Sequence, residues 1–96
     1  MPNRYFKILL KEEHKQFLRD TEFKGSKLDL KDGYIHLAFE DQIYTVINNH
    51  FKGMKDLYIL EIDPKGYNIE IENDYPHFYN DKLLYSSVKS VEKIDN

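Results

Sequence analysis

The 96-residue chain contains no cysteine and no tryptophan, and the lack of cysteine excludes several kinds of site. Without cysteine there can be no disulfide, no thiolate zinc or iron–sulfur centre, and no cysteine nucleophile. Glycine and proline are also sparse, with four and three residues, and no internal repeat or low-complexity tract is visible. A chain of this length is expected to form a single domain, over residues 1–96, that folds without covalent cross-links.

Long apolar runs and an excess of positive charge are absent as well. Near the N-terminus the longest apolar stretch is Ile8-Leu9-Leu10, which is too short for a signal peptide and far below the ~20 residues of a membrane-spanning helix. The 14 basic and 17 acidic residues give a formal charge of −3, which lacks the basic field typical of nucleic-acid-binding proteins. We therefore expect a cytoplasmic protein that binds a small molecule or nucleotide, not a membrane or nucleic acid, and the oligomeric state stays open.

The chain is rich in aromatic residues, with eight Tyr and six Phe, and its apolar residues follow patterns typical of a packed α+β domain. Strands are predicted over residues 4–10, 34–39, 56–63 and 67–72, with one or two more within 83–94. Helices are predicted over residues 11–20 and 40–51. Residues 21–33 and 73–82 contain many turn-forming residues and are predicted to be irregular. This order favours two helices on a mainly antiparallel sheet.

One histidine, His36, lies inside the apolar segment Tyr34-Ile35-His36-Leu37. A strand directs this side chain to a single face, where both ring nitrogens need partners. If that face is the core, a backbone carbonyl or a carboxylate must meet the ring. If the face borders a cleft, His36 is a hydrogen-bond donor for a ligand hydroxyl. The residues alone leave both interpretations open.

A second histidine, His77, lies in the segment Tyr75-Pro76-His77-Phe78-Tyr79. Pro76 restricts its own backbone and favours an extended conformation at Tyr75, so this segment is expected to be a rigid loop. Histidine and tyrosine side chains on such a loop are typical of ligand contacts. The alternative is that the aromatic residues close the end of the core and leave His77 exposed.

The remaining histidines show no sign of a metal site. His14 is expected on a solvated helix face and His50 at the edge of the core, and no two of the four histidines have metal-ligand spacing. The glycine-rich motifs of Rossmann folds and P-loops, and the GxSxG motif of hydrolases, are also absent from the sequence. We therefore expect no metal, and any nucleotide must be held in another way.

The segments around His36 and His77, in their order and spacing, resemble the bacterial family catalogued as domain of unknown function 952, whose hallmarks have the form DGFIHLS and FPHLYG. The resemblance covers about residues 5–91, beginning at the family's YKIL strand. That family looks like a compact relative of the ADP-ribosyltransferase superfamily, in which a split antiparallel sheet holds NAD in a central cleft. The matching residues are Tyr5-Phe6-Lys7-Ile8-Leu9, Gly25-Ser26, Asp29, Asp32-Gly33-Tyr34-Ile35-His36-Leu37, Gln42 and Tyr75-Pro76-His77-Phe78-Tyr79.

The resemblance implies a role for each matching side chain. In the superfamily a histidine on an early strand donates to a ribose hydroxyl of NAD, and His36 matches it. An aromatic ring stacks on the nicotinamide, and a glutamate bonds the ribose 2′-hydroxyl; Glu70 and Glu72 are both placed for the latter. His77 would contact a phosphate or the acceptor. The candidate catalytic residues are therefore His36, His77 and Glu72, and the candidate NAD-binding residues are His36, Tyr34, Tyr79, Ser26 and Asp32.

Two departures from the family pattern affect this expectation. Ala38-Phe39 stand where the family has Ser-Thr, so a hydroxyl contact to a ligand is lost, and Asn80 stands where the family has Gly.

The residues and the resemblance together lead to three hypotheses about function. The protein is an NAD-dependent ADP-ribosyl or related group-transfer enzyme, a non-catalytic small-molecule or nucleotide-binding module, or a small structural or interaction domain.

Overall fold

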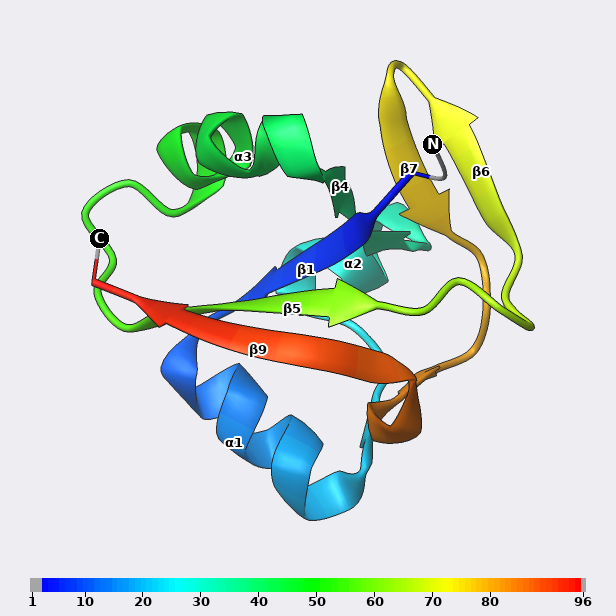
Figure 1. Ribbon diagram of the computed structural model, residues 1–96, viewed down its shortest axis with the longest axis horizontal. Helices are drawn as coiled ribbons and strands as arrows, with labels where there is room; N and C mark the ends of the chain where they lie inside the picture. Colours follow the sequence, from blue (N-terminus) through cyan, green and yellow to red (C-terminus); the bar gives the residue numbers. More distant parts are fainter. Residues whose placement is uncertain (1–2, 96) are drawn as a thin grey trace.

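The computed structural model describes residues 3–95, which form three antiparallel sheets, three α-helices and two short 3-10 helices (Figure 1). The helices are α1 (Lys11–Asp20), α2 (Lys27–Asp32), α3 (Ile43–His50), η1 (Glu40–Gln42) and η2 (Tyr85–Ser87). The strands are β1 (Tyr5–Leu9), β2 (Glu22–Phe23), β3 (Ile35–His36), β4 (Ala38–Phe39), β5 (Leu57–Ile62), β6 (Ile69–Glu72), β7 (Tyr75–Phe78), β8 (Leu83–Leu84) and β9 (Val88–Ile94). The sheet orders are β4-β1-β5-β9, β3-β7-β6 and β2-β8. The α+β class with antiparallel sheets is confirmed.

The four-stranded sheet is covered on both faces, by α1 on one side and α3 on the other (Figure 1). Successive side chains of a strand point to opposite faces, so β1 and β5 contribute to both cores. Leu9 packs with Phe17 of α1 in one cluster of buried residues. Phe6 and Ile8 pack with Ile47 of α3 in the other. The sheet with a helix on each face is the frame that positions the candidate site.

The single strand predicted over residues 34–39 is divided into β3 and β4, which belong to different sheets. His36 of β3 pairs with His77 of β7, whereas Ala38 of β4 pairs with Phe6 of β1. Leu37 lies between the two strands, and its amide donates to the carbonyl of Pro76 (3.1 Å). The apolar pattern could not show this change of partner, because it depends on which strands lie alongside. His36 is thereby placed where the four-stranded and three-stranded sheets meet.

The prediction that residues 21–33 are irregular is wrong, because the segment contains β2 and the helix α2. Ser26 begins α2 with reciprocal bonds to Asp29: Ser26 Oγ accepts from the Asp29 amide (3.2 Å), and Asp29 Oδ2 accepts from the Ser26 amide (2.9 Å). Gly33 ends the helix with a φ of 87°, which glycine adopts without strain. Apolar periodicity missed α2 because its leucines, Leu28 and Leu30, are exposed. The expectation of two helices is corrected to three.

The prediction that residues 73–82 form a loop is also wrong over its first half, where β7 is the central strand of the three-stranded sheet. Asn73 and Asp74 both have positive φ, 53° and 72°, and such two-residue turns match the twist of a β-hairpin. They connect β6 to β7. From the sequence, Pro76 indicated a rigid loop, and only the pairing of β7 with β3 and β6 shows that the segment is a strand.

The other predicted elements agree with the structure apart from their ends. Residues 40–51 begin with the 3-10 turn η1 before α3, and β6 is shorter than the predicted strand over residues 67–72. Ile71 of β6 is also exposed, so this strand is not half-buried in the expected way. Among the helices between residues 3 and 95, none combines the length and apolar character required to cross a membrane.

Candidate functional site

Asp29 of α2 is a buried carboxylate that holds the candidate site together. Its Oδ2 accepts from Lys7 Nζ (2.8 Å) and from the Ser26 amide, and its Oδ1 accepts from the backbone amide and the ring Nδ1 of His36 (3.0 and 2.6 Å). Lys7 Nζ also donates to the His36 carbonyl (3.0 Å). The side chains of Lys7 and Asp29 are 6% and 2% exposed. This interior network fixes both the backbone and the ring of His36.

The charge of Asp29 is stabilised by the groups around it. Burial opposes ionisation, but the Lys7 ammonium and the hydrogen bonds from Lys7, Ser26 and His36 outweigh it and lower the pKa of Asp29 to about 2. Sequence reasoning assigned no site role to Asp29 or Lys7. The Ser26-x-x-Asp29 spacing of a helix capping box could have indicated Asp29. No local pattern marks Lys7, whose contacts all come from distant segments.

The His36 ring is held from its other side by Asp32, the last residue of α2. His36 Nε2 lies within hydrogen-bond distance of Asp32 Oδ2 (3.1 Å), and Nδ1 contacts Asp29 Oδ1 (2.6 Å). Each nitrogen of this ring therefore faces a carboxylate oxygen. The His36 side chain is 30% exposed. Both alternatives left open by the sequence therefore hold in part: carboxylates meet the His36 ring, and the residue is also partly exposed.

His77 lies directly across the sheet from His36, because the two residues are partners in the β3–β7 pairing. Its Nδ1 donates to Glu72 Oε1 of β6 (2.9 Å). The Tyr34 ring stacks on the His77 ring, with centroids 4.0 Å apart and planes 13° from parallel. Burial and the carboxylates of Asp32, Glu72 and Asp29 raise the pKa of Tyr34. The Glu72 carboxylate therefore holds the His77 ring at Nδ1, and the Tyr34 ring covers one face of it.

Glu72 accepts a second hydrogen bond at the same oxygen, from the Tyr79 hydroxyl. The bond from Tyr79, together with that from His77, lowers the pKa of Glu72. The same Glu72 carboxylate raises the pKa of Tyr79 to about 12. Tyr79 and His77 thus keep Glu72 ionised and oriented toward the His77 ring.

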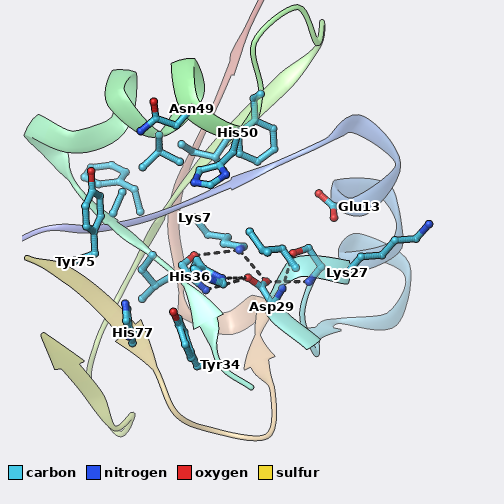
Figure 2. A pocket seen from close by; sticks show the side chains of 18 of the residues that line it. Lys7, Glu13, Lys27, Asp29, Tyr34, His36, Asn49, His50, Tyr75 and His77 are labelled. Atoms are coloured by element: carbon cyan, nitrogen blue, oxygen red, sulfur yellow. Dashed lines mark hydrogen bonds and ion pairs between the residues drawn. The ribbon is translucent and has the colours of Figure 1, made fainter. Parts of the chain in front are cut away.

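These residues border a cavity of about 770 Å³, which is within the usual range for small-molecule sites. Figure 2 shows Tyr34 and His77 on one side of it and Asn49 and His50 of α3 on the other, with the Lys7–Asp29–His36 network between them. The wall formed by β1, α3 and the segment after α3 is largely apolar. The apolar lining residues are Phe6, Ile8, Leu10, Leu28, Leu37, Ala38, Val46, Phe51 and Met54.

The structure brings most of the sequence candidates together. His36, His77, Glu72, Tyr34 and Ser26 all line the cavity. Asp32 does not line it and reaches the site only through the His36 ring. Tyr79 is likewise outside the lining and contacts the site through Glu72. Of the two glutamates left open by the sequence, Glu72 lines the cavity and Glu70 does not.

Two expectations about the other histidines are wrong. His14 is buried, not solvated, because α1 turns this residue against β5, where its ring stacks on Tyr58 with centroids 4.4 Å apart. Burial lowers the pKa of His14. His50 is exposed and lines the cavity, not the edge of the core. Within residues 3–95, no group of three or more potential metal-ligating side chains lies close enough to hold an ion.

Comparison with known proteins shows which family this chain is in. Residues 8–91 match the model of the family described as "Protein of unknown function (DUF952)". The chain belongs to this family. The crystal structure of protein CC0527 from Caulobacter crescentus is similar, with 28% sequence identity and a TM-score of 0.79, and the match covers 96% of this chain and 84% of that one. The crystal structure of a double mutant of CC0527 and the solution NMR structure of CC0527 cover the same shares at 28% identity, with TM-scores of 0.80 and 0.79.

No curated protein matches the chain. The family assignment confirms the resemblance to domain of unknown function 952, but the family's description names no ligand and no reaction. The relation to ADP-ribosyltransferases, the binding of NAD and the cytoplasmic location stay predictions.

Proposed function

We propose that the cavity binds an NAD-like nucleotide and that the protein transfers the ADP-ribosyl or a related glycosyl group from it. One observation carries the proposal: His36 and His77 are strand partners that border the same cavity, and each ring is held by a carboxylate. Two imidazoles fixed in this way are suited to bind hydroxyl groups and to move protons.

The fold supports the same proposal, which includes a compact ADP-ribosyltransferase-like architecture. The cavity is lined by β1 and β4 of the four-stranded sheet and by β3, β6 and β7 of the three-stranded sheet. This is the arrangement expected of a split antiparallel sheet with a central cleft. Small-molecule sites commonly lie between separate structural units of a protein.

The side chains present are compatible with the parts of NAD. A ribose hydroxyl would replace Asp32 at Nε2 of the His36 ring, which Asp29 orients, and the apolar wall around Phe6 and Ile8 would contact a base. Lys27 also lines the cavity and forms no ion pair among the described residues, so its ammonium group would bind a phosphate of the nucleotide. NAD would supply a glycosidic bond whose cleavage leaves positive charge on the ribose, and the Glu72 carboxylate is suited to stabilise that charge.

Titration of the labelled protein with NAD tests the proposal. We expect the ring signals of His36 and His77 to shift at millimolar NAD, and His36→Ala to weaken or abolish the binding. Glu70→Gln is the matched control, because Glu70 lies on the same strand as Glu72 but outside the cavity. The absence of any perturbation at either histidine would refute the proposal.

A second candidate, a binding module without chemistry, is favoured by one specific feature. Asp32 already occupies Nε2 of His36, and Ala38 lines the cavity where a hydroxyl is expected from the family pattern. Release of nicotinamide from NAD distinguishes the two functions: binding without release favours the module. Loss of stability in His36→Ala, without any ligand effect, would instead favour a structural domain.

A further inference from the structure

The two histidines of the site differ in how many of their ring nitrogens face a carboxylate. Both nitrogens of His36 face carboxylate oxygens, Nδ1 at 2.6 Å from Asp29 and Nε2 at 3.1 Å from Asp32. His77 donates only from Nδ1, to Glu72. When one ring nitrogen carries the proton, the other presents a lone pair. Carboxylates therefore occupy both nitrogens of His36, whereas His77 keeps an acceptor nitrogen at Nε2.

This acceptor nitrogen is accessible. Among the described residues, every buried side-chain nitrogen or oxygen has a hydrogen-bond partner. His77 Nε2 has none, so it is not closed off in the interior, although the residue as a whole is only 9% exposed. His77 lines the cavity. Because His77 lines the cavity, we place the ligand against this nitrogen.

We propose that His77 is the proton acceptor of this site, with Nε2 taking the proton from a hydroxyl of the acceptor substrate and Glu72 acting as its positioning residue. This inference rests on the proposed function. As the hydroxyl oxygen bonds to the anomeric carbon, its proton passes to Nε2. The bond from that carbon to the nicotinamide nitrogen breaks, and the electron pair leaves with the neutral base.

The surroundings of His77 fit this role. Glu72 accepts from Nδ1 and faces the charge that the ring gains with the second proton. The Tyr79 hydroxyl holds Glu72 at the same oxygen, so the carboxylate cannot turn away without breaking two bonds. The other titratable groups that contact the ring are Tyr34, stacked on its face, and His36, the strand partner. Neither takes Nε2.

The first experiment observes the His77 ring without any ligand. Two-bond correlation of the ring nitrogens in the ¹⁵N-labelled chain at pH 8 should show Nδ1 protonated and Nε2 unprotonated. In Glu72→Ala the acceptor is removed and the proton should move to Nε2, whereas Glu72→Gln retains an acceptor oxygen and should keep the wild-type state. Glu70→Gln should change nothing. Protonation at Nε2 in the wild type, or no change in Glu72→Ala, would overturn the inference.

The second experiment separates this inference from the proposed function. We expect His77→Gln to retain the NAD-induced shift of His36 and to release nicotinamide about 100-fold more slowly, the lower end of the effect of a general base. If His77→Gln binds NAD and releases nicotinamide at the wild-type rate, the role of His77 is overturned and the proposed function stands. If the wild type neither binds NAD nor releases nicotinamide, the proposed function fails, and with it the proton transfer, whatever the state of the ring.

Discussion

Replacing Asp29 by asparagine removes the negative charge at the centre of the buried network. The variant keeps the size of the side chain and one acceptor oxygen, but Lys7 loses its only ion-pair partner among the described residues. Because the Lys7 side chain is 6% exposed, water cannot replace that partner. Removing one member of a buried ion pair leaves an uncompensated charge and commonly costs about 3–5 kcal/mol of stability. We expect a loss of this size for Asp29→Asn at pH 7.

The pH dependence of the wild type gives a second value for the same interaction. The pKa of Asp29 falls from 3.8 to about 2 on folding, which corresponds to roughly 2 kcal/mol. Because the folded chain has the lower pKa, this stabilisation is fully present above about pH 4 and is lost as the pH falls toward 2. The variant has no carboxyl group at this position and should lack this part of the acid loss.

Urea unfolding followed by circular dichroism measures both effects. Asp81→Asn is the matched control, because Asp81 is exposed and makes no hydrogen bond or ion pair among the described contacts. Lys7→Met combined with Asp29→Asn should be less destabilised than the sum of the single variants, since the uncompensated charge is gone. A loss below about 1 kcal/mol in Asp29→Asn, outside the cost of a broken buried pair, would refute the reasoning. So would strict additivity in the double variant. If Asp29→Asn does not fold, the acid titration of the wild type still tests the pKa.

Three further changes have outcomes that the structure predicts. Gly25→Ala should lower the free energy of unfolding, measured in urea, more than Gly53→Ala. The new Cβ at position 25 would lie 2.9 Å from Asp29 Cβ, whereas at Gly53 only the left-handed backbone has a cost, about 1–2 kcal/mol. Equal losses in the two variants would contradict this. Burial lowers the pKa of His14, so its stabilisation is complete above about pH 6.5 and is lost as the pH falls. His14→Phe should therefore reduce the drop in urea midpoint between pH 7.5 and 5, and an unchanged drop would exclude His14 as its source. Ser26→Ala should lower the free energy of unfolding by about 1 kcal/mol through loss of the α2 cap, while Ser26→Thr, which keeps the hydroxyl, should stay near the wild type.

Elements whose signal is local were predictable from the sequence. The strand β1, the helix α1 and the strand β5 fall within the predicted ranges, because apolar runs mark the two strands and acidic residues mark the first turn of the helix. The segments α2 and β7 were missed for the opposite reason. The leucines of α2 face solvent, and β7 contains Pro76 and gains its strand conformation only through pairing with two neighbours.

The candidate site divides in the same way. His36 and His77 were found because a titratable residue in an apolar or rigid segment is locally conspicuous. Glu72 was named as a candidate from the resemblance, but only the structure shows that it lines the cavity and that Glu70, on the same strand, does not. Lys7 was missed entirely, because its partners Asp29 and His36 are 22 and 29 positions away.

By itself, the sequence determined the α+β class and the two segments that carry the histidines, and its lack of cysteine excluded thiolate chemistry. The tertiary structure decided how the histidines are used. It pairs β3 with β7, so that the two rings border one cavity, and it gives His36 two carboxylates but His77 only one. The physical reason is that the type of a helix or strand follows largely from its local sequence pattern. The partner that fixes a proton on one ring nitrogen, by contrast, comes from another part of the chain and is known only once the chain has folded.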